Sequence, residues 1–206
     1  MNLRKSRQFL RFVLKPILFL TLSLGFIDLA LGVMLEDLGP DPHKTLLLTT
    51  GEWALICLML TLSISPLVKW LNWPILSLVR RMCGLFVAFY ATLHLWVYIQ
   101  YILAFDWQSI FSELTRRPYI SIGFIAWLLL LPLAVTSNQW SMKRLGRRWK
   151  KLHKLTYIIA MLAVWHFAWQ VKLDLMEPIF YIIGLVILLG WRDRNRLKFN
   201  QSANKK

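Results

Sequence analysis

A chain of 206 residues that is 57% hydrophobic, with a mean hydropathy of +0.51, is too apolar for a soluble domain, whose surface would have to be mostly polar. The net charge of +15 does not indicate nucleic-acid binding, because the basic residues are spread over short segments between apolar stretches and do not gather on one soluble face. Composition therefore predicts an integral membrane protein whose basic residues contact water and anionic lipid.

The apolar stretches predict membrane-spanning helices. Each approaches or exceeds the roughly 20 residues that cross a hydrocarbon core of about 30 Å, although the last is short. The first has no small-x-small cleavage site before Glu36, so we expect it to remain as a helix and not to be removed as a signal peptide. The sequence thus predicts a single all-α domain over 1–206, a bundle of six transmembrane helices at about 16–35, 46–64, 82–103, 118–136, 153–171 and 177–191.

The distribution of lysine and arginine predicts the orientation of this bundle. Of the 25 basic residues, 21 fall in the N-terminus, the second and fourth connections and the C-terminal tail, and four fall in the remaining connections. Most acidic residues lie on the opposite side, including Asp106, Glu113 and Asp174. Because basic connections stay on the cytoplasmic side, both termini are predicted to be cytoplasmic.

Three histidines, His94, His153 and His166, lie in the third and fifth predicted helices. Both helices run outward, and His94 and His166 lie 12 and 13 residues from their cytoplasmic starts, about 18 to 20 Å along each axis. An imidazole in the membrane core is costly without a partner, and neutral histidine is a usual heme ligand. We therefore expect His94 and His166 to hold one heme iron, with small Ala91 and Ala163 leaving room for the macrocycle.

Missing motifs limit the chemistry of the chain. There is no G-x-G-x-x-G after a strand and no Walker loop, so the chain is not expected to bind its own NAD(P)H. Cys57 and Cys83 belong to no C-x-x-C-H motif, which excludes covalent c-type heme attachment and predicts buried apolar thiols.

A different class of function stays open on the same residues. The two histidines could hydrogen-bond across helices in a cofactor-free scaffold. Alternatively, they could form a proton or substrate path with Asp28 and Glu52, which lie in outer half-helices, in a small transporter.

Several runs of residues give the chain a resemblance to a known family. The runs are RRMCGL at 80–85, YATLH at 90–94, PLAVTS at 132–137 and WKKLHKLTY at 149–157, followed by His166. Together they resemble the ferric-reductase-like transmembrane family over essentially the whole chain.

Within that family the chain is most similar to heme-binding membrane subunits of bacterial periplasmic methionine sulfoxide reductase systems. The resemblance implies b-type heme, one or two per chain, on His94, His166 and in addition His153, with FMN as a further cofactor. It also implies a multi-pass protein of the bacterial inner (cytoplasmic) membrane that delivers electrons to a periplasmic molybdopterin subunit. The chain would then be an electron-transfer subunit and not the catalytic one.

The inner half of the predicted site is incomplete. The family stacks an inner and an outer heme on two histidines per helix, but the residue 14 positions before His94 is Arg80. His153 is therefore the ligand of a second heme or inner site without an evident partner. Thirteen residues of ideal helix rotate by about 140°, so His153 and His166 share a face only if the helix is irregular near His153.

Basic residues near both membrane surfaces are candidate partners of heme propionates or of a flavin phosphate, because guanidinium groups pair bidentately with such anions. A purely topological role for these charges is equally open. The candidates are Arg80, Arg81, Arg147 and Arg148 on the inner side and Arg116 and Arg117 on the outer side.

The predicted function is transmembrane electron transfer through heme. Electrons would come from a cytoplasmic flavin reductase or the membrane quinol pool and would serve the reduction of methionine sulfoxide in oxidised proteins. A stand-alone ferric reductase is a further alternative, against which the lack of a built-in flavin domain counts.

Overall fold

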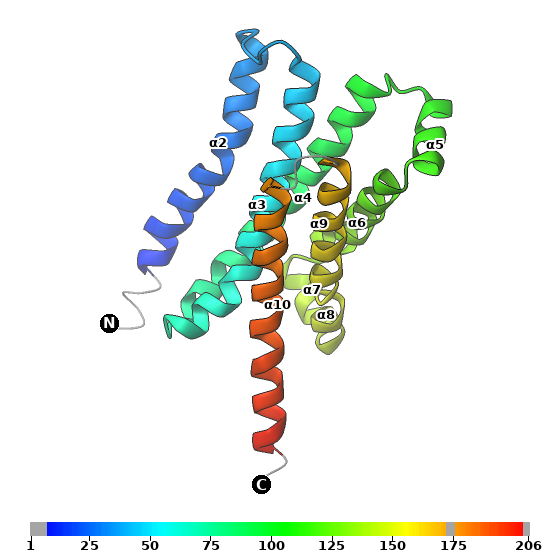
Figure 1. Cartoon of the computed structure of the whole chain (residues 1–206). Helices are drawn as coiled ribbons and strands as arrows, with labels where there is room; N and C mark the ends of the chain where they lie inside the picture. Colours follow the sequence, from blue (N-terminus) through cyan, green and yellow to red (C-terminus); the bar gives the residue numbers. More distant parts are fainter. Residues whose placement is uncertain (1–7, 172–175, 204–206) are drawn as a thin grey trace.

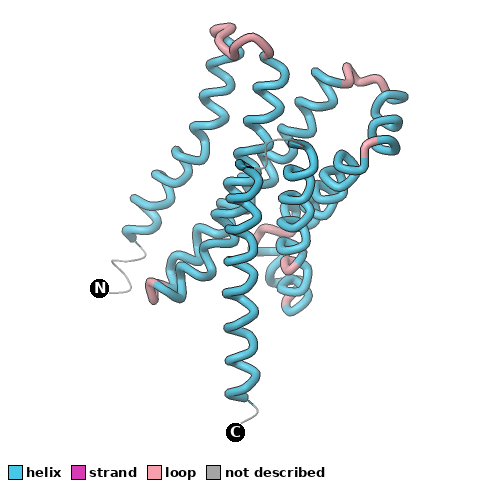
Figure 2. The backbone as a smooth tube through the Cα atoms, viewed as in Figure 1, coloured by secondary structure: helices cyan, strands magenta, loops and turns pink. Residues whose placement is uncertain are grey.

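The computed structural model describes residues 8–171 and 176–203, and the regular structure in these two ranges is entirely helical (Figure 2). The predicted all-α class is confirmed for this part of the chain. Several charges used to predict the orientation, including Asp174, lie outside the described residues. The α-helices are α2 Lys15–Met34, α3 Pro42–Trp70, α4 Arg80–Val97, α5 Trp107–Arg116, α6 Pro118–Val135, α7 Gln139–Leu145, α8 Arg147–Leu152, α9 Leu155–Val171 and α10 Met176–Ala203.

Three shorter helical segments extend α2 and both ends of α4. The π-helical turn Leu10–Leu14 precedes α2, and the 3-10 helix Pro74–Val79 precedes α4. A second π-helical turn, Tyr98–Ile102, continues α4 directly after the turn that carries His94. Single π-turns inside helices are often found at functional sites.

Four segments in the described part are long and apolar enough to cross a membrane: Phe12–Met34, Pro42–Trp70, Pro74–Ile102 and Pro118–Val135. They correspond to the first four predicted spans, and the second is longer than the predicted 46–64. The fifth and sixth predicted spans fall on α9, which has 17 residues, and α10, which has 28. The start of α2 and the C-terminal end of α10 lie at the same end of the bundle (Figure 1).

Local sequence explains where two of the helices begin. The Asp41 carboxylate accepts a hydrogen bond from the Lys44 backbone N–H at 3.1 Å, and Pro42 occupies the first turn of α3. The Asp106 carboxylate accepts from the Ser109 hydroxyl and from the N–H groups of Gln108 and Ser109 at the start of α5. These hydrogen bonds, with that of the Ser109 side chain foremost, lower the pKa of Asp106.

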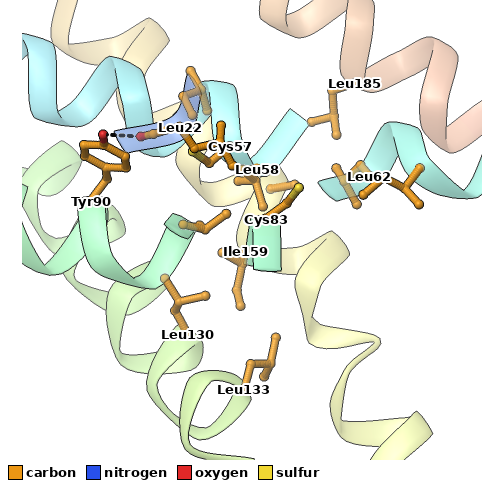
Figure 3. Packing of buried hydrophobic residues seen from close by; sticks show 14 of the residues in the cluster. Leu22, Cys57, Leu58, Leu62, Cys83, Tyr90, Leu130, Leu133, Ile159 and Leu185 are labelled. Carbon is orange, nitrogen blue, oxygen red and sulfur yellow. Dashed lines mark hydrogen bonds between the residues drawn. The ribbon is translucent and has the colours of Figure 1, made fainter. Parts of the chain in front are cut away.

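The core lies between α3, α4, α6 and α9 (Figure 3). α3 packs most extensively on α4, and α6 on α9, while α10 lies against α9 and α3. Cys57 and Cys83 are 0% and 1% exposed and are free thiols, as predicted.

Tyr90 of α4 is hydrogen-bonded to the backbone of α2. Its side chain is fully buried, and its hydroxyl donates to the Leu22 carbonyl at 2.6 Å and accepts from the Phe26 N–H at 3.0 Å (Figure 3). Phe26 is four residues after Leu22, so the hydroxyl is inserted into the hydrogen-bond ladder of α2. This bridge holds the peripheral α2 beside the helix that carries His94.

Candidate functional site

His94 projects from α4 toward α3. Its Nδ1 atom lies 2.9 Å from the Leu47 carbonyl oxygen and 3.5 Å from the Thr50 hydroxyl oxygen, both on α3. A carbonyl oxygen can only accept, so Nδ1 carries the proton and donates it to Leu47. The Nε2 atom of this tautomer keeps its lone pair.

His166 repeats this arrangement on the other pair of helices. It projects from α9, and its Nδ1 atom donates to the Tyr119 carbonyl oxygen of α6 at 2.7 Å. The His166 tautomer is thus the same as that of His94. Histidines that bind metals through Nε2 usually donate Nδ1–H to a carbonyl or carboxylate, which fixes the ring and strengthens it as a ligand.

The two imidazoles lie next to each other in the bundle. Their ring centroids are 6.3 Å apart and their planes are inclined at 81°. A metal–imidazole bond is about 2 Å long, so two rings that hold one ion from opposite sides have centroids about 6 Å apart. The observed separation therefore fits a pair of axial ligands. The structure brings together the two histidines that equal depth predicted to meet, and their role as iron ligands stays a prediction.

A metal held here would need ligands beyond the side chains. The described residues contain no group of three or more His, Cys, Asp or Glu side chains that could hold a metal ion. Two neutral imidazoles without a carboxylate or thiolate match the axial set of a heme, whose porphyrin supplies the remaining ligands.

His153 lies apart from this pair. It occupies the irregular step between α8 and α9, so the break in the helix that a shared face would require is present. Its Nε2 atom is 3.1 Å from the Thr136 hydroxyl, and its ring stacks on Trp149 at 3.9 Å. The Trp149 indole N–H donates to the Thr136 carbonyl at 3.0 Å. Thirteen residues separate His153 from His166, about 20 Å of helix, so the two cannot share an ion.

The predicted arginine candidates lie at the bundle surface. Arg80 donates to the Ser65 hydroxyl at 2.7 Å and ties the start of α4 to α3. All six side chains are exposed: Arg80, Arg81, Arg116, Arg117, Arg147 and Arg148. Their roles toward propionates or phosphate stay predictions.

Arg117 belongs to a polar network near the C-terminal end of α4 and the start of α6. Its Nε atom pairs with the Glu113 carboxylate at 3.1 Å, and Glu113 also accepts from the Tyr98 hydroxyl at 2.9 Å. The Tyr119 hydroxyl, 3.4 Å from Arg117, and the Glu113 charge raise the pKa of Arg117. The network joins Tyr98, one turn after His94, to Tyr119, whose carbonyl holds His166.

The carboxylates of the transporter alternative do not join the histidines. Asp28 on α2 and Glu52 on α3 are both exposed, and neither makes a hydrogen bond or ion pair with His94 or His166 among the described residues. This arrangement favours a site built on the two imidazoles alone.

Sequence reasoning missed the residues behind the two rings. Gly51 and Gly123 lie against them, since a Cβ atom added to Gly51 would be 3.0 Å from His94, and one added to Gly123 would be 2.8 Å from His166. Each glycine precedes its histidine by 43 residues, and each acceptor carbonyl precedes it by 47. That repeated spacing was the signal in the sequence that could have found them.

Comparison with known families places the chain in one of them. The family described as the ferric reductase like transmembrane component matches residues 50–164, more than half of the chain. The matched region includes Gly51, His94 and His153 and ends two residues before His166. The chain belongs to the ferric reductase like transmembrane family.

Curated relatives narrow the comparison. The chain is 47% identical over 168 residues to the protein-methionine-sulfoxide reductase heme-binding subunit MsrQ of Xanthomonas axonopodis pv. citri, covering 82% of this chain and 77% of the relative. It is 40% identical over 184 residues to the MsrQ subunit of Bordetella pertussis, and this match covers 87% of this chain and 88% of the relative. The resemblance to heme-binding subunits of methionine sulfoxide reductase systems is confirmed. No solved structure matches.

Proposed function

We propose that this chain binds heme b between His94 and His166 and carries electrons across the bacterial inner membrane to a periplasmic methionine sulfoxide reductase. The observation that carries the proposal is the pair of imidazoles, 6.3 Å apart, with each Nδ1 atom donating to a helix carbonyl. A heme bound there supplies reversible one-electron transfer.

The residues of the chain set up this site in three ways. The carbonyls of Leu47 and Tyr119 hold both rings in the tautomer whose Nε2 lone pair is free to bind. The Tyr98–Glu113–Arg117 network closes the outer end with groups that hydrogen-bond to one another. The apolar surface of α2, α3, α4 and α6 keeps the site within the bilayer.

Six crossings with both termini in the cytoplasm are part of the proposal. The shared end of α2 and α10 supports an even number of crossings (Figure 1). The excess of basic residues in the connections at that end supports its cytoplasmic placement.

The proposal also names an electron donor and an acceptor. The donor we propose is a cytoplasmic flavin reductase or a membrane quinol, because the sequence contains no nucleotide-binding motif of its own. The acceptor we propose is the periplasmic molybdopterin subunit MsrP, and the names of the MsrQ relatives support a methionine sulfoxide reductase as partner. His153 would serve an inner site, either a second heme or FMN.

The experiment uses the full chain in lipid vesicles and follows heme reduction optically. NAD(P)H alone should leave the heme oxidised, while NAD(P)H with a soluble flavin reductase, or a quinol analogue, should reduce it. Adding the molybdopterin subunit and a protein containing methionine sulfoxide should then reoxidise it. Rapid reduction by NAD(P)H alone, or reoxidation only by ferric chelates, would contradict the proposal, and the latter would favour a ferric reductase.

A further inference from the structure

Each candidate ligand rests on a carbonyl and a glycine that are four residues apart on the neighbouring helix. His94 donates to the carbonyl of Leu47 and packs on Gly51. His166 donates to the carbonyl of Tyr119 and packs on Gly123.

Helix geometry explains why glycine stands at the second position. The carbonyl of residue i already accepts the N–H of residue i+4, and its second lone pair faces outward. A side chain at i+4 leans toward the helix N-terminus and covers that carbonyl. Glycine leaves the carbonyl open, so an imidazole from the next helix can approach within hydrogen-bond distance.

The arrangement occurs twice with identical spacing. His94 follows Leu47 by 47 residues, and His166 follows Tyr119 by the same number. Each histidine also follows its glycine by 43 residues. The two helix pairs, α3 with α4 and α6 with α9, are also the two most extensive helix contacts of the fold. Two independent instances of the same acceptor, glycine and ring indicate a requirement of the site and not a chance contact.

We propose that Gly51 and Gly123 are positioning residues, which open the Leu47 and Tyr119 carbonyls so that both axial histidines present Nε2 and gain donor strength. This inference rests on the proposed heme binding. A strong Nδ1–H···O=C bond increases the basicity of an imidazole and so favours the oxidised over the reduced iron. The two glycines would thereby keep the midpoint potential low, as suits a chain that passes electrons onward.

The first test is a graded set of alanine variants. In Gly123→Ala the new Cβ would lie 2.8 Å from the His166 ring, so the ring must move, whereas in Gly51→Ala the distance to His94 is 3.0 Å and a smaller shift suffices. Gly84→Ala on α4 is the matched control, because its Cβ would make an ordinary 3.9 Å contact with the Thr61 methyl group. Alanine favours helix at all three positions.

The readouts are heme affinity and midpoint potential of the purified protein. We expect Gly123→Ala to lower heme affinity by about 10- to 100-fold, which is the usual effect of losing the hydrogen-bond partner of a metal ligand. The midpoint potential should shift to more positive values. Gly51→Ala should show the same changes to a smaller extent, and Gly84→Ala should match the unaltered protein. Equal behaviour of all three variants would overturn the inference.

A second measurement needs no heme and leaves both glycines unaltered. Histidine labelled with ¹⁵N in the heme-free chain should show His94 and His166 as Nδ1–H tautomers, assigned by comparison with His94→Ala and His166→Ala. The Nε2–H tautomer at either ring would overturn the inference. If the tautomers are as expected but the chain binds no heme, the proposed function fails while the carbonyl and glycine arrangement stands, so the two failures are distinguishable.

Discussion

Replacement of His94 and His166, singly and together, tests whether the two rings share one ion. The centroid separation of 6.3 Å matches two axial bonds to one metal, so alanine at either position should remove or convert to high spin the same heme. Because both ligands act as one unit, the double variant should be no worse than the worse single variant.

The expected magnitudes separate a shared ion from two independent sites. Loss of a group that hydrogen-bonds to a metal ligand costs about 10- to 100-fold in metal affinity, and loss of the ligand itself should cost at least about 100-fold. At independent sites each single variant would lose only its own heme and keep the other, and only the double variant would lose both, whereas a shared ion would leave the double variant near the single-variant value.

The assay is heme titration of the detergent-purified chain, followed by the low-spin absorption bands and the heme-to-protein ratio. His43→Ala is the matched control, because His43 is exposed in the first turn of α3 and stacks on Tyr101 at 4.8 Å, away from the pair. Additive losses in the double variant, or an intact low-spin heme in either single variant, would refute the pairing.

Three further changes probe other parts of the structure. His153→Ala should spare the low-spin signal but slow reduction from the cytoplasmic side in stopped-flow experiments. Loss of the signal in His153→Ala while His94→Ala keeps it would place the iron near the inner surface. Tyr90→Phe leaves the Phe26 N–H without its hydroxyl partner and should lower the free energy of unfolding in mixed detergent by about 1 to 2 kcal/mol. An unchanged value would mean that the Phe26 N–H instead donates directly to the Leu22 carbonyl of α2. Asp106, whose pKa is lowered by its hydrogen bonds, stabilises the start of α5 above its unfolded pKa, and this contribution is lost as the pH falls through the folded pKa. The protection of the Ser109 amide, its exchange rate compared with that of an unstructured peptide at the same pH, should therefore fall at acid pH, and Asp106→Ala should show the low protection at every pH.

Elementary helix geometry was enough to predict part of the site from the sequence. Apolar length located the first four spans, and counting residues along two outward-running helices placed His94 and His166 at one depth. Both inferences depend on distances along single helices, which the sequence specifies directly. The meeting of the rings then follows because their helices belong to one compact bundle.

Features that depend on contacts between helices were not predictable in this way. Gly51 and Gly123 matter through the imidazoles that lie on them, and their equal spacing to the two histidines gains meaning only once those contacts are known. Arg117 was considered as a partner of an anionic cofactor or as a topological charge, yet it pairs with Glu113, whose position depends on how α5 folds back on α6. The hydrogen bonds that His153 and Trp149 make to Thr136 likewise depend on how the end of α6 lies against α8.

The most direct test of heme binding by His94 and His166 is the visible and EPR spectrum of the full chain purified from heme-replete cells, with its heme-to-protein ratio. We expect a low-spin, dithionite-reducible b-type spectrum whose heme extracts into acid acetone, since no covalent anchor is present. The 81° angle between the ring planes predicts a highly anisotropic ferric EPR signal. Folded protein that is colourless under these conditions would contradict the electron-transfer function and favour the scaffold or transporter.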